Sequence, residues 1–266
     1  MITLNHGWKC SIKEFLQLSL HDFIQTLTSY VYGSLSSQQW LDEQEKIQSQ
    51  QNAWKDCFEK LQQIFHNYNT LDGWLIFEYS ILRGSGRRPD VLLLLPGHVL
   101  VIECKSYNAV SAAEYLQTSL YVLDIEHYHS AVQQHSLNVT GVLLLTNHTS
   151  DTLLPKNEFH VYLASQNSLH KLINGLIKRS ENNTITADQF LDGTYQPSIL
   201  YAGGSTRQFL VAYYVHRMEL LEHVLARYLL NLKSSYKALV CFQLYIINIE
   251  QRILFNRIRC SICITK

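Results

Sequence analysis

The stretch RRPDVLLLLPGHVLVIECKSY, residues 87–107, contains two apolar runs joined by a Pro-Gly pair. Val91 to Leu95 and Val99 to Cys104 are rich in aliphatic and β-branched residues, which is typical of strands. Pro96-Gly97 between them is a turn signal. The stretch therefore predicts a β-hairpin, with ionisable residues where its apolar runs end.

The pairing of the two strands decides which ionisable side chains meet. If residues 96–97 form a two-residue loop, Asp90 lies opposite Glu103; if residues 97–98 form it, Asp90 lies opposite Lys105. Both registers put the two acids and the lysine on one face, because side chains two apart share a side of a strand. Directly opposed residues have Cβ atoms about 4.5–5.5 Å apart. A three-residue loop with a bulge would break this pairing, so the expectation depends on the turn.

Both faces of the predicted hairpin are apolar, because residues 91–95 and 99–102 contain no polar side chain. A sheet that is buried on both sides needs helices or other layers over both faces. Two acids and a lysine at the end of such a strand pair are costly without a partner. A bound cation explains the trio best, and an exposed hairpin end with solvated charges is the alternative.

Pro89-Asp90, followed after a strand and a turn by Glu103-Cys104-Lys105, resembles the PD-(D/E)XK nuclease signature. The signature is short, and its placement on two predicted strands adds specificity. The resemblance implies an α/β fold, a restriction-endonuclease-like three-layer α/β/α core with a mixed sheet and extra helices at both ends. It implies that Asp90 and Glu103 hold Mg²⁺ (or Mn²⁺), with the backbone carbonyl of Cys104 as a further ligand. Lys105 would orient or deprotonate the attacking water, or stabilise the transition state.

The composition predicts a globular protein whose nucleic-acid contacts are local. Of the 266 residues 47% are hydrophobic and 17% are charged, and 22 basic residues balance 22 acidic ones. No global field would therefore attract nucleic acid. The best local patch is Arg83, Arg87 and Arg88 with Lys105, and we expect it to contact phosphates without reading bases. DNA is the expected partner, with RNA left open.

Cysteine usage and hydropathy predict a reducing cytoplasm and no membrane partner. Six cysteines are scattered, and Cys260 and Cys263 alone form a C-x-x-C, without the second ligand pair of a zinc site. We expect Cys104 to pack as a small hydrophobe. The start of the chain lacks a signal-peptide pattern, and no uncharged apolar run reaches the roughly 20 residues that span a bilayer.

Three regions follow from the order of patterns along the chain. Residues 1–70 predict helices that pack on the core, including one long helix from Ser36-Ser37 to Phe65. Residues 71–205 predict the nuclease-like core, and residues 206–266 an apolar C-terminal region of uncertain role. Within the core we expect further strands at residues 74–82, 138–146 and 159–164, and helices at residues 111–132 and 168–178. A strand, crossover helix and strand in succession predict a parallel pair.

Three further positions bear on the site. Glu78, on the strand before the hairpin, resembles the additional upstream acid of many PD-(D/E)XK enzymes, as a third metal ligand or the partner of a basic residue; a solvated strand glutamate is the alternative. Gln117 and Tyr121 lie four apart on one helical face. They resemble the Gln-x-x-x-Tyr motif of the exonuclease branch, where both residues face the active site, although a packed tyrosine is common.

With Asp124 and His129 added, the pattern resembles the N-terminal nuclease-like domain of Schlafen-like DNA/RNA helicases. No G-x-x-x-x-G-K-[ST] occurs, so the chain is not itself that helicase but a stand-alone or truncated relative. The histidines around the predicted helix end fit a solvated surface better than a metal site; they are His127, His129 and His135.

The function predicted first is a metal-dependent nuclease that hydrolyses phosphodiester bonds of DNA, or of RNA, with exo- and endonuclease action both open. The alternatives are a catalytically silent nucleic-acid-binding module, since a fold does not imply a function, and a truncated accessory part of a helicase-nuclease. An interaction protein is a third reading, in which the C-terminal region contacts a second copy or a helicase partner.

Overall fold

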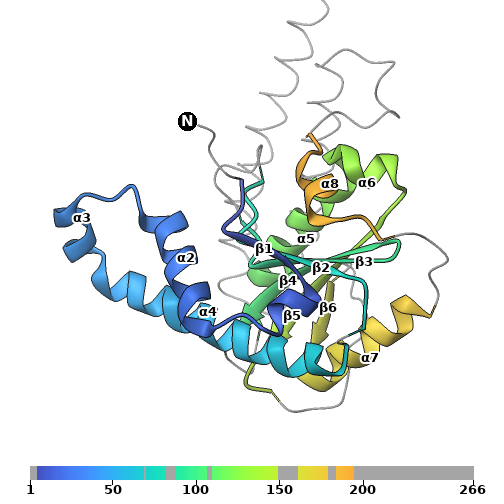
Figure 1. Ribbon diagram of the computed structural model, residues 1–266, viewed down its shortest axis with the longest axis horizontal. Helices are drawn as coiled ribbons and strands as arrows, with labels where there is room; N and C mark the ends of the chain where they lie inside the picture. Colours follow the sequence, from blue (N-terminus) through green and yellow to red (C-terminus); the bar gives the residue numbers. More distant parts are fainter. Residues whose placement is uncertain are drawn as a thin grey trace, which may run out of the picture. The chain divides into compact units, whose positions relative to one another are not determined.

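The strands of the described part of the chain form one six-stranded mixed sheet. The computed structural model describes residues 5–68, 70–81, 88–106, 110–148, 161–178 and 184–194. Within them the strand order is β1-β2-β3-β4-β5-β6, with helices on both faces (Figure 1). The predicted α/β class is thereby confirmed. The predicted C-terminal region, residues 206–266, lies outside the described residues.

The order of the strands across the sheet is the same as their order in the sequence. They are β1 Trp8–Ser11, β2 Trp74–Phe77, β3 Val91–Leu95, β4 His98–Lys105, β5 Asn138–Leu145 and β6 Val161–Ala164. Neighbours from β1 to β4 are antiparallel, whereas β4, β5 and β6 are parallel. The predicted strand after the crossover helix is thus confirmed as a parallel neighbour of the hairpin.

The hairpin has the register of a two-residue loop at Pro96-Gly97. Leu95 pairs with His98 and Val91 pairs with Ile102. Gly97 has a φ of 69°, which costs a glycine nothing because it has no Cβ. All of β3 and residues 99–102 are buried on both faces, as predicted.

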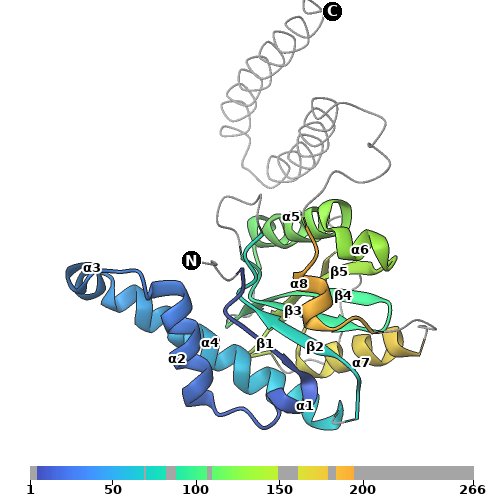
Figure 2. The ribbon, with the colours of Figure 1, turned by 45° about the horizontal axis from the view of Figure 1, so that its top comes forward.

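The helices form two layers. They are α1 Ile12–Phe15, α2 Leu20–Tyr32, α3 Ser37–Asp42, α4 Gln44–Phe65, α5 Ala112–Tyr128, α6 Ser130–Gln134, α7 Gln166–Ile177 and α8 Ala187–Leu191, with a 3₁₀ turn at His66–Tyr68. Helices α1, α2, α4 and α7 share an apolar cluster with one face of the sheet, and α5, α6 and α8 share a second cluster with the other (Figures 1 and 2). This arrangement is compatible with three α/β/α layers. None of the described helices is long and apolar enough to cross a membrane.

Three predictions about the helices were wrong. The N-terminal region is not helical throughout, because β1 pairs with β2; this four-residue strand is defined by its partner rather than by local alternation. The long helix expected up to Phe65 is divided at Glu43 into α3, which Ser36 caps through Gln39, and α4. The helix that begins after Ser111 ends at Tyr128, and His129 in extended geometry separates it from α6.

Candidate functional site

Three acidic residues lie in one row across the ends of β2, β3 and β4. The pairs Phe77–Val91 and Val91–Ile102 set the register, and the next row of the backbone contains Glu78, Asp90 and Glu103. The backbone N–H of Glu78 donates to the carbonyl of Asp90 at 3.1 Å. The opposed pair expected from the hairpin, Asp90 and Glu103, is therefore present.

Backbone hydrogen bonds hold the two carboxylates of this pair. The N–H of Asp90 donates to Glu103 Oε1 at 3.2 Å, and the N–H of Cys104 donates to Asp90 Oδ2 at 2.8 Å. Glu103 is buried, while Asp90, directly before β3, is partly exposed. Each acid is thus oriented by the strand that carries the other.

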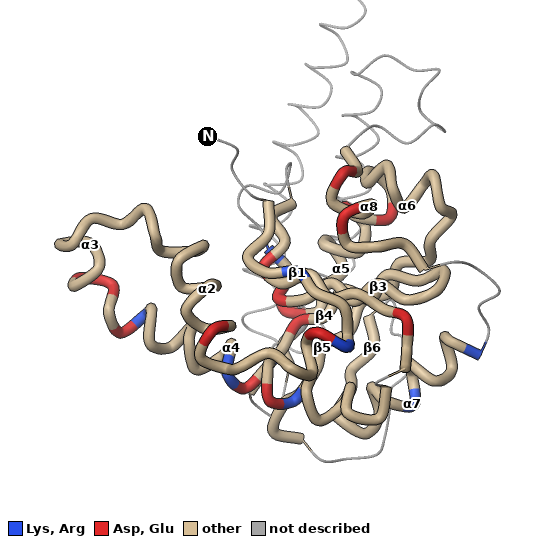
Figure 3. Tube along the Cα trace, viewed as in Figure 1, with Lys and Arg blue, Asp and Glu red and all other residues tan. Residues whose placement is uncertain are grey.

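The Lys105 ammonium lies beside this pair. Its Nζ is 3.4 Å from Glu103 Oε2, and its side chain is 19% exposed. Burial lowers the pKa of Lys105, but the carboxylates of Glu103 and Asp90 more than offset this, so the pKa is raised. The lysine is therefore a partly exposed cation at neutral pH. Figure 3 shows acidic and basic positions close to one another near the labels of β1 and β4.

Burial also raises the pKa of both acids of the pair. The pKa of Asp90 is raised by burial, against the hydrogen bond from Cys104 and the charge of Lys105. The pKa of Glu103 is raised well above its usual value by burial and by the neighbouring Asp90. Two such carboxylates repel each other when ionised. A divalent cation between them would remove that repulsion.

Glu78 is buried rather than solvated, so the alternative of a solvated strand glutamate is wrong. The residue is 5% exposed and has a φ of 52°, which ends β2 short of the predicted residue 82. Its Oε1 accepts the indole N–H of Trp54 at 2.7 Å, and its Oε2 lies 3.5 Å from Arg88 Nε. Burial and the charge of Asp90 raise the pKa of Glu78 to about 7, against these two partners. Both oxygens therefore already have a protein partner.

The donor set of the pair suits a hard divalent cation. The carbonyl of Lys105 accepts Thr146 N–H on the β5 side, so the backbone groups of Cys104 point toward Asp90. Two carboxylates and one backbone carbonyl are oxygen ligands, and Mg²⁺ uses one or two carboxylates while keeping several waters. Among the described residues no cluster of three or more His, Cys, Asp or Glu side chains has metal-binding geometry. The residues present fit a water-rich Mg²⁺ or Mn²⁺ site and not a site closed by side chains.

The thiol of Cys104 faces helix α4. Its Sγ lies 2.7 Å from Cys57 Sγ, and both cysteines are free. Cys104 is partly exposed and packs against the cluster that contains Cys57. The expected role as a small packing residue agrees with this position, while the Cys57 contact had no signal in the sequence.

The remaining predicted residues are placed unequally. Gln117 Nε2 donates to the hydroxyl of Tyr121 at 2.7 Å; the glutamine is exposed and the tyrosine is buried. The Gln-x-x-x-Tyr pair thus lies on one face of α5. Glu114, one turn earlier, adds to the upward shift of the pKa of Lys105, so the first turn of α5 is near the site. Of the arginine patch Arg88 is described, whereas Arg83 and Arg87 lie outside the described residues.

The prediction that His129 belongs to a solvated surface was wrong. Its ring is fully buried, stacks on Phe190 with centroids 4.0 Å apart, and lies 3.1 Å from the Tyr79 hydroxyl. Burial lowers the pKa of His129 to about 4. The ring is therefore neutral at physiological pH and packs between α6 and α8. His127 and His135 do lie at the surface.

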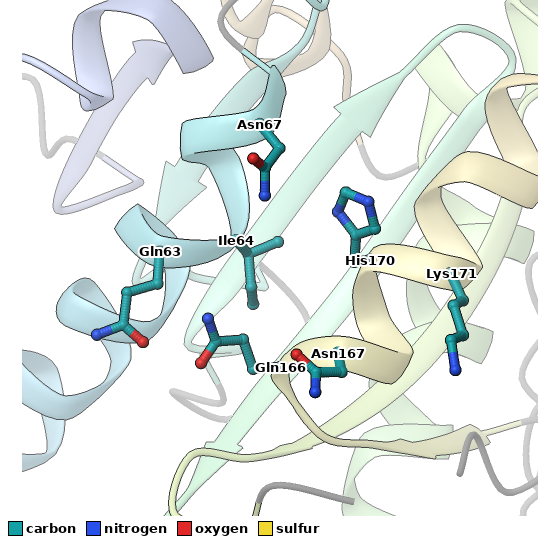
Figure 4. Close-up of a pocket in the computed structure, with 7 residues that line it drawn as sticks. All are labelled: Gln63, Ile64, Asn67, Gln166, Asn167, His170 and Lys171. Atoms are coloured by element: carbon teal, nitrogen blue, oxygen red, sulfur yellow. The ribbon is translucent and has the colours of Figure 1, made fainter. Parts of the chain in front are cut away.

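A separate concavity of about 270 Å³ lies between α4 and α7 (Figure 4). Its lining is rich in carboxamides, and the side chains come from the end of one helix and the start of the other: Gln63, Ile64, Asn67, Gln166, Asn167, His170 and Lys171. None of the predicted site residues lines it, and none of its lining residues is acidic. The concavity therefore does not supply the carboxylate chemistry described above.

The comparisons with known proteins found no family model, no curated protein and no solved structure that matches this chain. The functional assignment accordingly rests on the residues of the chain and their geometry.

Proposed function

We propose that the protein is a divalent-metal-dependent nuclease with a restriction-endonuclease-like core of the PD-(D/E)XK type. The observation that carries the proposal is the directly opposed pair Asp90 and Glu103 with the Lys105 ammonium 3.4 Å from Glu103 Oε2. A buried carboxylate pair with a single adjacent lysine is costly as a structural device. A bound cation and a bound phosphate would neutralise the charges of the carboxylates and the lysine.

In this proposal Asp90, Glu103 and the carbonyl of Cys104 hold Mg²⁺ or Mn²⁺. When bound, the metal would lower the pKa of a coordinated water and neutralise charge on the attacked phosphate. Glu103 Oε1 and Asp90 Oδ2 are already fixed by backbone N–H groups, so the pair needs little reorganisation to accept a cation.

Lys105 acts as a hydrogen-bond donor rather than a base. Its raised pKa keeps it protonated, so the ammonium would donate to a non-bridging phosphate oxygen or orient the attacking water. Because the lysine side chain is partly exposed, a substrate phosphate can reach the ammonium from solvent.

The substrate class proposed is nucleic acid, with DNA ahead of RNA, held by phosphate contacts from Arg88 and, outside the described residues, Arg83 and Arg87. A reducing cytoplasm suits the free thiols of Cys57 and Cys104 beside the site. The pattern similarity to Schlafen-like helicases supports a nuclease module that acts with a helicase partner.

The test is cleavage of linear duplex, circular duplex and single-stranded DNA, with RNA beside them, in Mg²⁺, in Mn²⁺ and in EDTA. We expect metal-dependent cleavage by the wild type, abolished in Asp90→Ala and reduced at least a hundredfold in Lys105→Ala. Lys13→Ala, at an exposed lysine on α1, is the matched control and should cleave normally. A wild type that binds DNA and cuts nothing would replace the nuclease with the silent binding module.

A further inference from the structure

The guanidinium of Arg88 pairs with the buried carboxylate of Glu78, which the buried indole of Trp54 holds in turn. The indole N–H of Trp54 donates to Glu78 Oε1 at 2.7 Å, and both residues are buried, with 4% and 5% of their surface exposed. The second oxygen of Glu78 lies 3.5 Å from Arg88 Nε. Within the described residues the terminal nitrogens of Arg88 have no ion pair of their own, and its side chain is 32% exposed. The arginine is therefore anchored at one end and open at the other.

This arginine lies at the carboxylate row. Arg88 precedes Pro89-Asp90, and a residue before proline is biased to extended backbone. The N–H of Glu78 donates to the carbonyl of Asp90, so the acid that anchors the arginine also contacts the proposed metal ligand through the backbone. The guanidinium of Arg88 therefore lies with Glu78 on the α4 side of the strand ends, and Arg88 is two residues along the chain from Asp90.

A strained backbone turns Glu78 toward its partners. In regular alternation its side chain would follow Ile76 to the α5 face of the sheet, whereas the φ of 52° directs it to Trp54 on α4 and gives the α5 face to Tyr79. Left-handed geometry is unfavourable for a residue with a Cβ and persists where surrounding contacts determine it. The strained backbone of Glu78 thus places its carboxylate between the Trp54 indole and the Arg88 guanidinium, where it can orient the arginine.

We infer that Trp54 is a positioning residue of the site: it fixes Glu78, and Glu78 orients Arg88 so that the terminal nitrogens of the guanidinium bind a phosphate of the nucleic-acid strand. The inference rests on the proposed nuclease function and assigns part of the site to the N-terminal helices. Arginine suits this task because its planar fork can bind a carboxylate at one edge and a phosphate at another.

The competing explanation is that Arg88 only neutralises the buried charge of Glu78. In that case replacement of Trp54 or Arg88 lowers the stability of the fold, and it lowers activity only by reducing the amount of folded enzyme. A double-mutant cycle in kcat/KM separates the two explanations, because the effects of two residues that act through one another on the same step are not additive.

The experiment measures kcat/KM for DNA cleavage over a series of salt concentrations in the wild type, Trp54→Phe, Arg88→Ala and the double variant. Arg88→Ala should lower kcat/KM about 10- to 100-fold and reduce the slope of log(kcat/KM) against log[salt] by about one. Trp54→Phe keeps an aromatic ring but loses the N–H. It should lower kcat/KM about tenfold in the wild-type background and have little effect when Arg88 is absent.

Phe58→Leu is the matched control for a core change on the same helix. Phe58 is buried one turn after Trp54 and packs on Phe15 and Phe23. The Phe58→Leu variant should be less stable than the wild type but have the same salt slope. Equal effects of Trp54→Phe in both backgrounds, or an Arg88→Ala enzyme with wild-type kinetics and salt slope, would overturn the inference while the nuclease stands. A wild type without cleavage would overturn both.

Discussion

Replacement of Glu78 by glutamine should make the metal-free protein more stable than the wild type at alkaline pH and leave its stability unchanged at acid pH. The carboxyl is buried, and burial with the nearby Asp90 raises its pKa from 4.5 to about 7. A glutamine carboxamide at this position would keep an oxygen for the indole N–H of Trp54 and carry no charge. The variant therefore removes the buried charge without removing the hydrogen-bond acceptor.

The magnitude follows from the shift. About 2.5 pKa units at 1.36 kcal/mol per unit correspond to about 3 kcal/mol. The sign follows from linkage: the folded state binds the proton more tightly than the unfolded state, so stability falls as pH rises from 4.5 through 7. Wild type and Glu78→Gln should be alike near pH 4.5 and differ by about 3 kcal/mol at about pH 8.

Urea unfolding in EDTA at several values of pH across this range measures the difference as the free energy of unfolding. Glu59→Gln, at an exposed carboxylate on α4, is the control, because water solvates its charge in the folded and the unfolded chain. If the curves of Glu78→Gln and wild type ran parallel over the whole range, Trp54 and Arg88 would fully compensate the buried charge, and the electrostatic reasoning would fail.

Three other predictions test the fold around the site. His129, whose pKa burial lowers to about 4, should make the wild type lose about 2 kcal/mol of stability between about pH 7.5 and pH 5, because the unfolded state binds the proton first; His129→Gln should lack this loss in urea unfolding. Gly141→Ala should lower the free energy of unfolding by about 1–3 kcal/mol, since an added Cβ would lie 2.9 and 3.0 Å from two valine methyl groups. Gly175→Ala, where an added Cβ has nothing within 4 Å, should instead raise it by about 0.5–1 kcal/mol. The denaturant midpoints of the two variants and the wild type measure the difference. Ser111→Ala should cost about 1 kcal/mol through the lost cap of α5, measured by thermal unfolding, and equal stability of wild type and variant would refute that role.

The hairpin could be predicted from the sequence because its information is local. Residues 91–95 and 99–102 are apolar throughout, and Pro96-Gly97 between them limits the register to few alternatives. The two-residue loop among these places Asp90 opposite Glu103, as the structure shows. A pairing that depends on a turn and on period-two alternation needs no tertiary context.

The surroundings of Glu78 could not be predicted, because they depend on one backbone angle and on distant partners. Nothing in a glutamate within an apolar strand indicates a positive φ, and alternation places its side chain on the wrong face. Trp54 meets it across 24 residues of sequence, and in sequence this tryptophan is indistinguishable from the other apolar positions of its helix. A strained residue near a site is where local rules are expected to fail.

His129 and β1 illustrate the same limit. A histidine near a helix end is usually solvated, and its burial follows from the stacking of Phe190 from a helix far along the chain. β1 is four residues long and pairs with a strand that is distant in the sequence. Both are settled by tertiary packing, which overrides weak local preferences.

Calorimetric titration of Mn²⁺ into the wild type and Asp90→Asn tests the cation site most directly. We predict one bound ion per chain for the wild type, with more protons released as the pH is lowered, because burial raises the pKa values of Asp90 and Glu103 and the cation competes with protons for the pair. Asp90→Asn should bind at least tenfold more weakly and release fewer protons. Absence of binding at millimolar Mn²⁺, or equal affinity in both proteins, would contradict the metal site and with it the nuclease.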